Sequence, residues 1–130
     1  LHIILRGGKK KTNYDAASIK EVCNFLETKD LDTKVIVDMS HGNSQKIHTN
    51  QIIVCDSICS QIIKGNNNIL GVMIESNLKE GNQKLIKKED LEWGVSITDA
   101  CIDMDTTCNL LNNLYEALSS RFRKRKICDI

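Results

Sequence analysis

Four side chains that could take part in chemistry lie at or just beyond short apolar runs. Arg6 follows HIIL, His41 follows VIVDMS, and Glu75 lies near the end of ILGVMIES. A second carboxylate, Asp99, lies in a later run, GVSITDAC. In folds built on parallel strands, functional groups gather beyond the carboxyl ends of the strands. We therefore expect an arginine, a histidine and two carboxylates to converge on one rim.

These residue types suit a metal centre beside an anion site. His41, Glu75 and Asp99 together offer nitrogen and oxygen ligands for a divalent ion such as Mn, Fe, Co or Zn. Arg6 suits a phosphate or carboxylate, because its planar guanidinium donates two parallel hydrogen bonds. Lys46 lies near the same rim, where it either assists phosphate binding or is simply solvated.

Each residue of the rim also has a purely structural interpretation. A histidine at a strand end can be a satisfied polar group, Glu75 can cap a turn, and Asp99 can cap a helix. Arg6 can pair with Asp38, a carboxylate inside a strand that needs a partner because an unpaired buried charge is costly. The shared position at strand exits is what favours a metal site.

The spacing of the apolar runs predicts strands and helices in alternation. The runs begin at Ile3, Val35 and Ile69, at intervals of 32 and 34 residues. A parallel crossover through a helix takes about 30 residues. The runs are apolar throughout, which is typical of strands buried on both faces. The sequence therefore predicts an α/β fold made of parallel βα repeats.

Three amphipathic helices are expected between and after these strands. The first can be capped by Asp15 or by Ser18, the second ends near Gly65, and Asp105 can cap the third. The expected apolar faces are Ile19, Val22, Cys23 and Leu26 in the first, Ile52, Cys55, Cys59 and Ile62 in the second, and Cys108, Leu111, Tyr115 and Leu118 in the third.

Length and composition indicate a single domain without linkers. The chain has 130 residues, of which 27% are charged, and a formal net charge of +1, which argues against nucleic acid or an anionic membrane as a general partner. No apolar run approaches the roughly 20 residues of a membrane span. The chain begins at Leu1, within a predicted strand, so we expect it to be a piece of a longer protein.

Two further patterns leave alternatives open. The six cysteines are interpreted as small buried residues of a reducing cytosol, and disulfides or a zinc site are the alternative. The tail RFRKRKICDI is interpreted as the solvated end of the last helix, and a nucleic-acid patch or nuclear address is the alternative.

Three βα units are fewer than half of a closed eight-unit barrel, which takes about 250 residues. The units could therefore belong to part of such a barrel, and an open doubly wound sheet is the competing architecture. That fold would favour a phosphate-binding G-x-G-x-x-G after the first strand, and RGGKKKTN does not match this pattern.

Four separated motifs carry a resemblance that covers nearly the whole chain. In order they are HIILRGGKKKTNYDA, VDMSHGNS, GVMIESNLKEGNQ and GVSITDACID. They resemble the C-terminal part of the class I 3-deoxy-D-arabino-heptulosonate 7-phosphate (DAHP) synthases. GGKKKTNYDA, which lacks the proline common in bacterial members, is more similar to the fungal versions.

The resemblance implies that residues 1–130 are the C-terminal part of a single TIM (β/α)8-barrel domain and contribute its last three βα units. It implies a cytoplasmic transferase, homo-oligomeric at full length, that condenses phosphoenolpyruvate with erythrose 4-phosphate and releases phosphate. This is the first step of the shikimate pathway to the aromatic amino acids. The resemblance makes His41, Glu75 and Asp99 the catalytic metal ligands, and it makes Arg6 a phosphoenolpyruvate ligand.

The same resemblance shows what this chain does not contain. The family's fourth metal ligand, an upstream cysteine, has no matching motif here, and neither does the Lys-Pro-Arg-Thr segment that receives erythrose 4-phosphate. We therefore expect the 130 residues alone to be inactive. We also expect them to leave a strand edge and the inner barrel face uncovered, which favours association.

Two other functions are weighed against this one. A related phosphoenolpyruvate-dependent synthase of an eight-carbon sugar-acid phosphate would share the ligands, although NYDA and KEGNQ favour the DAHP enzyme. Alternatively, the chain is an inactive truncated product that serves only as an interaction module.

Overall fold

Three parallel strands form the centre of the molecule. The computed structural model describes residues 3–128, and their side chains as far as Phe122. The strands are β1 (Ile3–Leu5), β2 (Val35–Asp38) and β3 (Ile69–Met73), in the spatial order β1-β2-β3. Both pairs are parallel, with Leu5 beside Val37 and Val37 beside Val72. The predicted parallel βα fold is confirmed.

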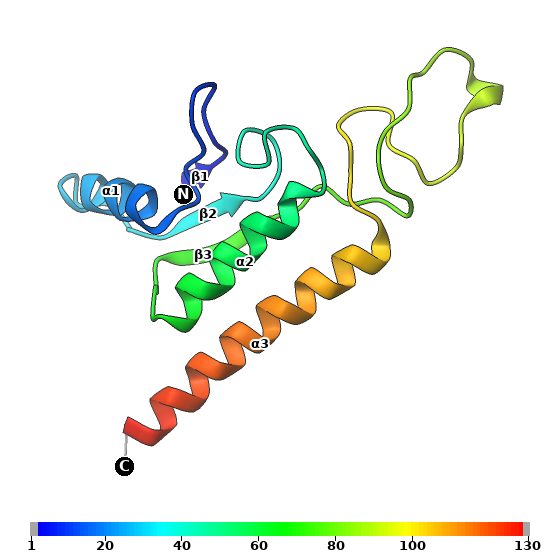
Figure 1. Ribbon diagram of the computed structural model, residues 1–130. Coiled ribbons are helices and arrows are strands. Elements are labelled where there is room, and N and C mark those ends of the chain that lie inside the picture. The colour runs from blue at the N-terminus through cyan, green and yellow to red at the C-terminus, as the bar shows by residue number, and fades with distance from the viewer. Residues whose placement is uncertain (1–2, 129–130) are drawn as a thin grey trace.

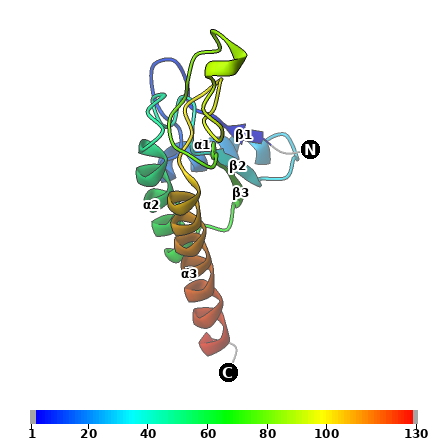
Figure 2. The ribbon, with the colours of Figure 1, turned by 90° about the vertical axis from the view of Figure 1, so that its right-hand side faces the viewer.

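Three α-helices follow the strands in the predicted alternation: α1 (Ala16–Glu27), α2 (Asn50–Ile63) and α3 (Met104–Cys128). A short 3-10 helix, η1 (Lys88–Asp90), lies in the long excursion between β3 and α3. Figures 1 and 2 both show α2 and α3 side by side, and this is the most extensive contact between elements. The excursion extends away from the strands and helices at the upper right of Figure 1.

One face of the sheet carries the hydrophobic core. Val35 and Val37 are fully buried there, together with Leu5, and all three helices contribute side chains to the same cluster. Elsewhere on the strands, Ile4, Leu70 and Met73 are exposed. The expectation that this chain leaves apolar strand surface uncovered is therefore met in the structure.

Helix α1 begins and packs as the sequence predicts. The Asp15 carboxylate accepts a hydrogen bond from the backbone N–H of Ser18 at 2.9 Å, so Asp15 is the N-cap. Ile19, Cys23 and Leu26 are buried, four and three residues apart, as a helix face requires.

The predicted start of α3 is wrong by two residues. The Asp103 carboxylate, not that of Asp105, accepts a hydrogen bond from the backbone N–H of Thr106 at 2.8 Å. Hydrogen bonds from Thr106 hold the pKa of Asp103 below its usual value. Asp105 lies in the first turn, where its negative charge still favours the helix dipole.

The predicted apolar faces of α2 and α3 are wrong in part. In α2, Cys55 and Ile62 are buried, but Ile52 is exposed. The buried residues of this helix are Gln51, Val54, Cys55, Ile58, Gln61 and Ile62. Apolar residues lie on several sides of α2, so their periodicity alone did not identify the side that meets the core.

In α3 the predicted face is exposed in this chain. Leu111, Tyr115 and Leu118 are 51%, 68% and 39% exposed, while Leu110, Leu114 and Ala117 are buried and belong to the core. The helix thus carries two apolar faces, and only one of them meets the core. From position 123 onward, the basic tail lies beyond the described side chains.

The five cysteines that the structure describes are free thiols, and the predicted burial is correct for only three of them. Cys23, Cys55 and Cys101 are buried, Cys59 is half-buried and Cys108 is exposed. Burial raises the pKa of the Cys55 thiol to about 12. Within the described part of the chain, no helix has the length and apolar character needed to cross a membrane.

Candidate metal centre

Three of the predicted site residues converge at the carboxyl ends of the strands. His41, Glu75 and Asp99 each place one potential ligand atom within 4.8 Å of the others. His41 Nε2 lies 3.6 Å from Glu75 Oε1 and 3.4 Å from Asp99 Oδ2. The histidine is the most sheltered of the three, since its side chain is 17% exposed against 33% for Glu75 and 63% for Asp99.

His41 lies in a tight turn that begins where β2 ends. Its backbone has a positive φ of 47°, a left-handed conformation that is uncommon for residues other than glycine. The His41 carbonyl accepts hydrogen bonds from the Lys46 backbone N–H at 2.9 Å and from the Ser44 hydroxyl at 3.2 Å. These bonds close the turn and hold the backbone of the histidine in place.

Asp38 contacts the other nitrogen of the His41 ring. Asp38 Oδ2 lies 2.7 Å from His41 Nδ1, and Asp38 Oδ1 accepts a hydrogen bond from the Ser40 backbone N–H at 2.8 Å. The expected pair with Arg6 is present but longer, at 3.6 Å from Arg6 Nε. The principal partner of the buried carboxylate is thus the histidine.

Direct backbone contact joins the Arg6 loop to the His41 loop. A Cβ atom on Gly7 would lie 2.5 Å from the Asn43 backbone nitrogen, and one on Gly42 would lie 2.8 Å from the Gly7 carbonyl carbon. Only glycine permits this approach. Asn43 adds to it, because its side-chain amide donates to the carbonyls of Leu5 and Asp38 at 3.0 and 2.8 Å.

Glu75 is held through its backbone by a side chain from α2. The amide group of Gln51, which is fully buried, accepts a hydrogen bond from the Glu75 N–H at 2.9 Å and donates one to the Glu75 carbonyl at 3.0 Å. Ile102 N–H also donates to the Glu75 carbonyl, at 3.0 Å. The end of β3 is therefore tied both to α2 and to the segment that follows Asp99.

Asp99 lies in the excursion and not at the end of a regular strand. The run GVSITDAC forms isolated bridges, among them Gly81 with Cys101 and Asn82 with Ser96. The pKa of the buried Cys101 thiol is raised, first by desolvation and further by the negative charges of Glu75 and Asp99. Cys101 Sγ lies 4.0 Å from Glu75 Oε2, so the thiol borders the cluster.

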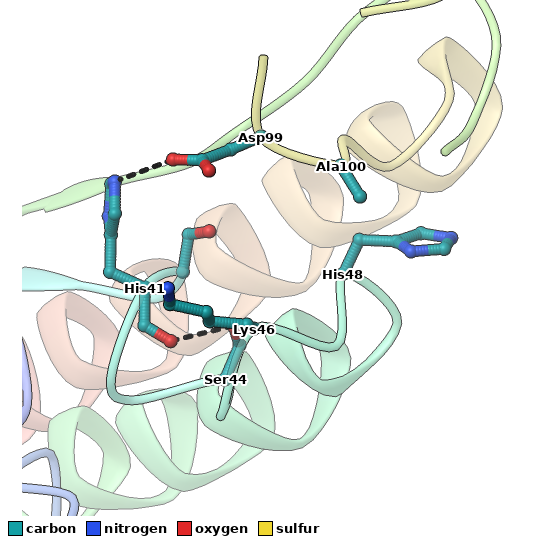
Figure 3. Close-up of a pocket in the computed structure, with 7 residues that line it drawn as sticks. His41, Ser44, Lys46, His48, Asp99 and Ala100 are labelled. Carbon is teal, nitrogen blue, oxygen red and sulfur yellow. Dashed lines mark hydrogen bonds and ion pairs between the residues drawn. The ribbon is translucent and has the colours of Figure 1, made fainter. Parts of the chain in front are cut away.

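Arg6 and Lys46, the two predicted anion ligands, line an open cavity next to the candidate metal ligands. Arg6, Lys46, His41 and Asp99 all contribute to its walls. The other nearby histidine, His48, has a different orientation: Figure 3 shows its ring pointing away from His41 and Asp99. Its Nε2 lies 3.2 Å from Glu80.

Sequence reasoning missed two residues of this centre, Gln51 and Asn43. Both are polar and fully or almost fully buried. The asparagine could have been noted, because it directly follows the His-Gly pair in SHGNS. Gln51 gave no such signal, because the residue that it contacts is 24 positions away.

Comparison with known proteins assigns the chain to a family. The sequence model described as "DAHP synthetase I family" matches residues 1–112. The chain belongs to the DAHP synthetase I family. The resemblance found in the four motifs is thereby confirmed.

Relatives within this family come from fungi and bacteria. The chain is 52% identical over 121 residues to a phospho-2-dehydro-3-deoxyheptonate aldolase of Alternaria alternata, with 92% of this chain covered. It is 50% identical to the Trp-sensitive aldolase of the same name from Salmonella typhi, with 93% covered. It is 47% identical over 128 residues to the tyrosine-inhibited aldolase of Schizosaccharomyces pombe, with 95% covered.

The fold agrees with a solved structure of a DAHP synthetase I family relative. The phospho-2-dehydro-3-deoxyheptonate aldolase of Francisella tularensis superposes with a TM-score of 0.88 at 47% identity, over 92% of this chain and 35% of the other. The chain spans about a third of the length of the curated relatives, 32% of the Alternaria alternata protein and 34% of the other two.

Proposed function

We propose that this chain supplies a metal centre and part of an anion site to a 3-deoxy-7-phosphoheptulonate synthase. In this proposal residues 1–130 form the C-terminal part of one TIM-barrel domain. The reaction joins phosphoenolpyruvate to erythrose 4-phosphate and releases phosphate. The observation that carries the proposal is the convergence of His41, Glu75 and Asp99 in a member of this family.

The donor set fits one divalent ion. Ligands about 2.1 Å from an ion at tetrahedral angles lie roughly 3.4 Å apart. His41 Nε2 lies 3.4 and 3.6 Å from the two carboxylate oxygens, which is close to that spacing. One imidazole nitrogen and two carboxylates suit Mn, Fe, Co or Zn.

A divalent ion held at this centre supplies a Lewis acid that polarises the aldehyde of erythrose 4-phosphate. The residues of the chain hold and orient the reactants around it. His41 and Glu75 occupy fixed positions because Asp38 and Gln51 hydrogen-bond to them. Asp99 is the most exposed of the three ligands, and it lines the open cavity.

Arg6 and Lys46 are proposed as substrate ligands. Arg6 Nε lies 3.6 Å from Asp38, and the terminal guanidinium nitrogens can donate hydrogen bonds to a carboxylate or phosphate of phosphoenolpyruvate. Lys46 lines the same cavity and is exposed. Two cations at the wall of one cavity offset the negative charge of a phosphorylated substrate.

A chimeric enzyme tests this proposal. The corresponding third of the Alternaria alternata aldolase is replaced by residues 1–121 of this chain, and consumption of phosphoenolpyruvate is measured with manganese and erythrose 4-phosphate. We expect turnover close to that of the parent enzyme. The His41→Ala substitution in the chimera should lower turnover by more than about 100-fold. Loss of a residue that only supports a metal ligand costs about 10–100-fold, and loss of the ligand itself should cost more.

The control is His48→Ala, which removes a histidine that lines a separate small pocket together with His41 and Asp99 but whose ring points away from both. Its turnover should match that of the unmodified chimera. Equal activity of the His41→Ala and His48→Ala proteins would refute the proposed role of His41. The 130-residue chain alone is expected to be inactive, and turnover near that of a complete relative would contradict this.

We further propose that the complete protein acts in the cytoplasm as a homo-oligomer and has no nucleic-acid or membrane partner. The near-neutral net charge of these 130 residues supports the last point for this part of the protein, because it provides no general attraction to polyanions.

A further inference from the structure

Asp38 is a fully buried carboxylate for which the proposed chemistry gives no direct task. It lies at the end of β2 with none of its surface exposed. Burying an ionised carboxylate is costly unless hydrogen-bond donors and positive charge compensate for it. Its donors here are Ser40 N–H at 2.8 Å and His41 Nδ1 at 2.7 Å, with Arg6 Nε at 3.6 Å.

We propose that Asp38 is a positioning residue that keeps the proton of the neutral His41 ring on Nδ1 and aims Nε2 at the metal. This inference rests on the proposed function, because it takes His41 as a metal ligand. A carboxylate accepts hydrogen bonds and does not donate them, so the nitrogen that faces Asp38 must carry the hydrogen. Nε2 then presents its lone pair toward Glu75 and Asp99, the two other ligands.

The ring and the backbone of His41 are held by different contacts. The backbone turn depends on Ser44 and Lys46, which bond to the His41 carbonyl. The ring depends on Asp38, which makes the closest contact to Nδ1. A change at Asp38 should therefore alter the ring's tautomer and direction while the turn persists.

The surroundings of Asp38 determine how an asparagine would sit in its place. Ser40 N–H can only donate, so the amide oxygen of Asp38→Asn must stay on the Ser40 side. The amide nitrogen would then face Nδ1 and donate to it. The His41 proton would move to Nε2, the atom that must be free to bind a cation.

The closing experiment uses the 130-residue chain with zinc as the probe. Zinc binding is measured by calorimetry for the wild type and for Asp38→Asn. The ring nitrogens of His41 are observed by 15N NMR without metal, and the tautomer is read from the spectrum of the neutral imidazole. We expect zinc affinity to fall about 10–100-fold in Asp38→Asn, as is usual when the partner of a metal-bound histidine is lost. The proton should move from Nδ1 to Nε2.

Asp56→Asn is the matched control, because it makes the same substitution at an exposed aspartate of α2. It should change neither the zinc affinity nor the tautomer of His41. A wild-type ring protonated on Nε2, or equal zinc affinity for Asp38→Asn and the wild type, would overturn the proposal.

The two proposals fail in different ways. If the wild type takes up no zinc, the metal centre of the proposed function fails, and the metal-free tautomer of His41 still decides the role of Asp38. If Asp38→Asn does not fold, the wild-type tautomer decides it: a proton on Nδ1 supports the proposal, and a proton on Nε2 ends it.

Discussion

At the scale of single residues, the contacts that matter most join side chains to the backbone. Asn43 donates to two backbone carbonyls, and Gln51 bonds to both the backbone N–H and the backbone carbonyl of Glu75. Asp15 caps helix α1. Each satisfies backbone groups that would otherwise need water. Short polar side chains thereby fix the loops that carry the candidate ligands.

The Asp15 cap gives α1 a pH-dependent stability. Hydrogen bonds from Ser18 lower the pKa of Asp15 below its usual 3.8, so its contribution is fully present above that pH and is lost as the pH falls through the lower folded-state pKa. We expect Asp15→Ala to cost about 1 kcal/mol at neutral pH. Asp15→Asn should retain most of this stability and remove the part of the acid dependence that Asp15 contributes. Urea unfolding at neutral and acidic pH measures both effects, and equal stability of Asp15→Ala and the wild type at neutral pH would contradict the assignment.

At the scale of elements, α2 does more than cover the sheet. Its first turn places Gln51 against Glu75, and its last turns place Gln61 against the Tyr14 carbonyl at 2.8 Å. One helix therefore connects the metal centre at one end with the loop before α1 at the other. Both glutamines are buried, so both are expected to contribute to stability.

Comparing the two glutamines separates support of the site from general stability. Gln51→Met and Gln61→Met each leave backbone groups unpaired, and we expect each to cost about 1–3 kcal/mol. Only Gln51→Met should also weaken zinc binding, because only Gln51 holds the backbone of a candidate ligand. Thermal unfolding and calorimetry measure the two effects. Equal loss of zinc affinity in both variants would show that the effect is general.

At the scale of the whole molecule, apolar surface is left on two sides. Strand residues such as Ile4 and Leu70 are exposed. So is a stripe along α3, here called the α3 stripe, which consists of Met104, Cys108, Leu111, Tyr115, Leu118 and Phe122. The solved relative from Francisella tularensis, of which this chain covers 35%, shares this fold. We expect the rest of the proposed barrel to cover both surfaces.

A charge placed in the α3 stripe should have different effects in the 130-residue chain and in the chimera. In the 130-residue chain, Leu111→Glu is expected to reduce self-association, because it places a charge in an exposed apolar surface. In the chimera, the same substitution should destabilise the enzyme by several kcal/mol, since the charge would be buried without a partner. Asn112→Glu, on an adjacent exposed position, is the control. Sedimentation and thermal unfolding are the measurements, and an unchanged unfolding temperature for Leu111→Glu in the chimera would mean that the stripe stays uncovered there.

The sequence by itself determined the parallel βα order, the face of α1 and the motifs of the family. These depend on local periodicity and spacing, which are visible along the chain. The exits of the strands also indicated where Arg6, His41 and Glu75 would meet, because parallel strands end at one edge.

Only the tertiary structure decided which apolar face of α2 and α3 enters the core, because both helices offer more than one and the choice depends on what packs against them. It also decided that Asp38 partners His41 more closely than Arg6, and that Gln51 reaches across 24 residues to Glu75. Contacts between distant segments follow from how the chain packs in three dimensions, and no local pattern of residue types encodes them.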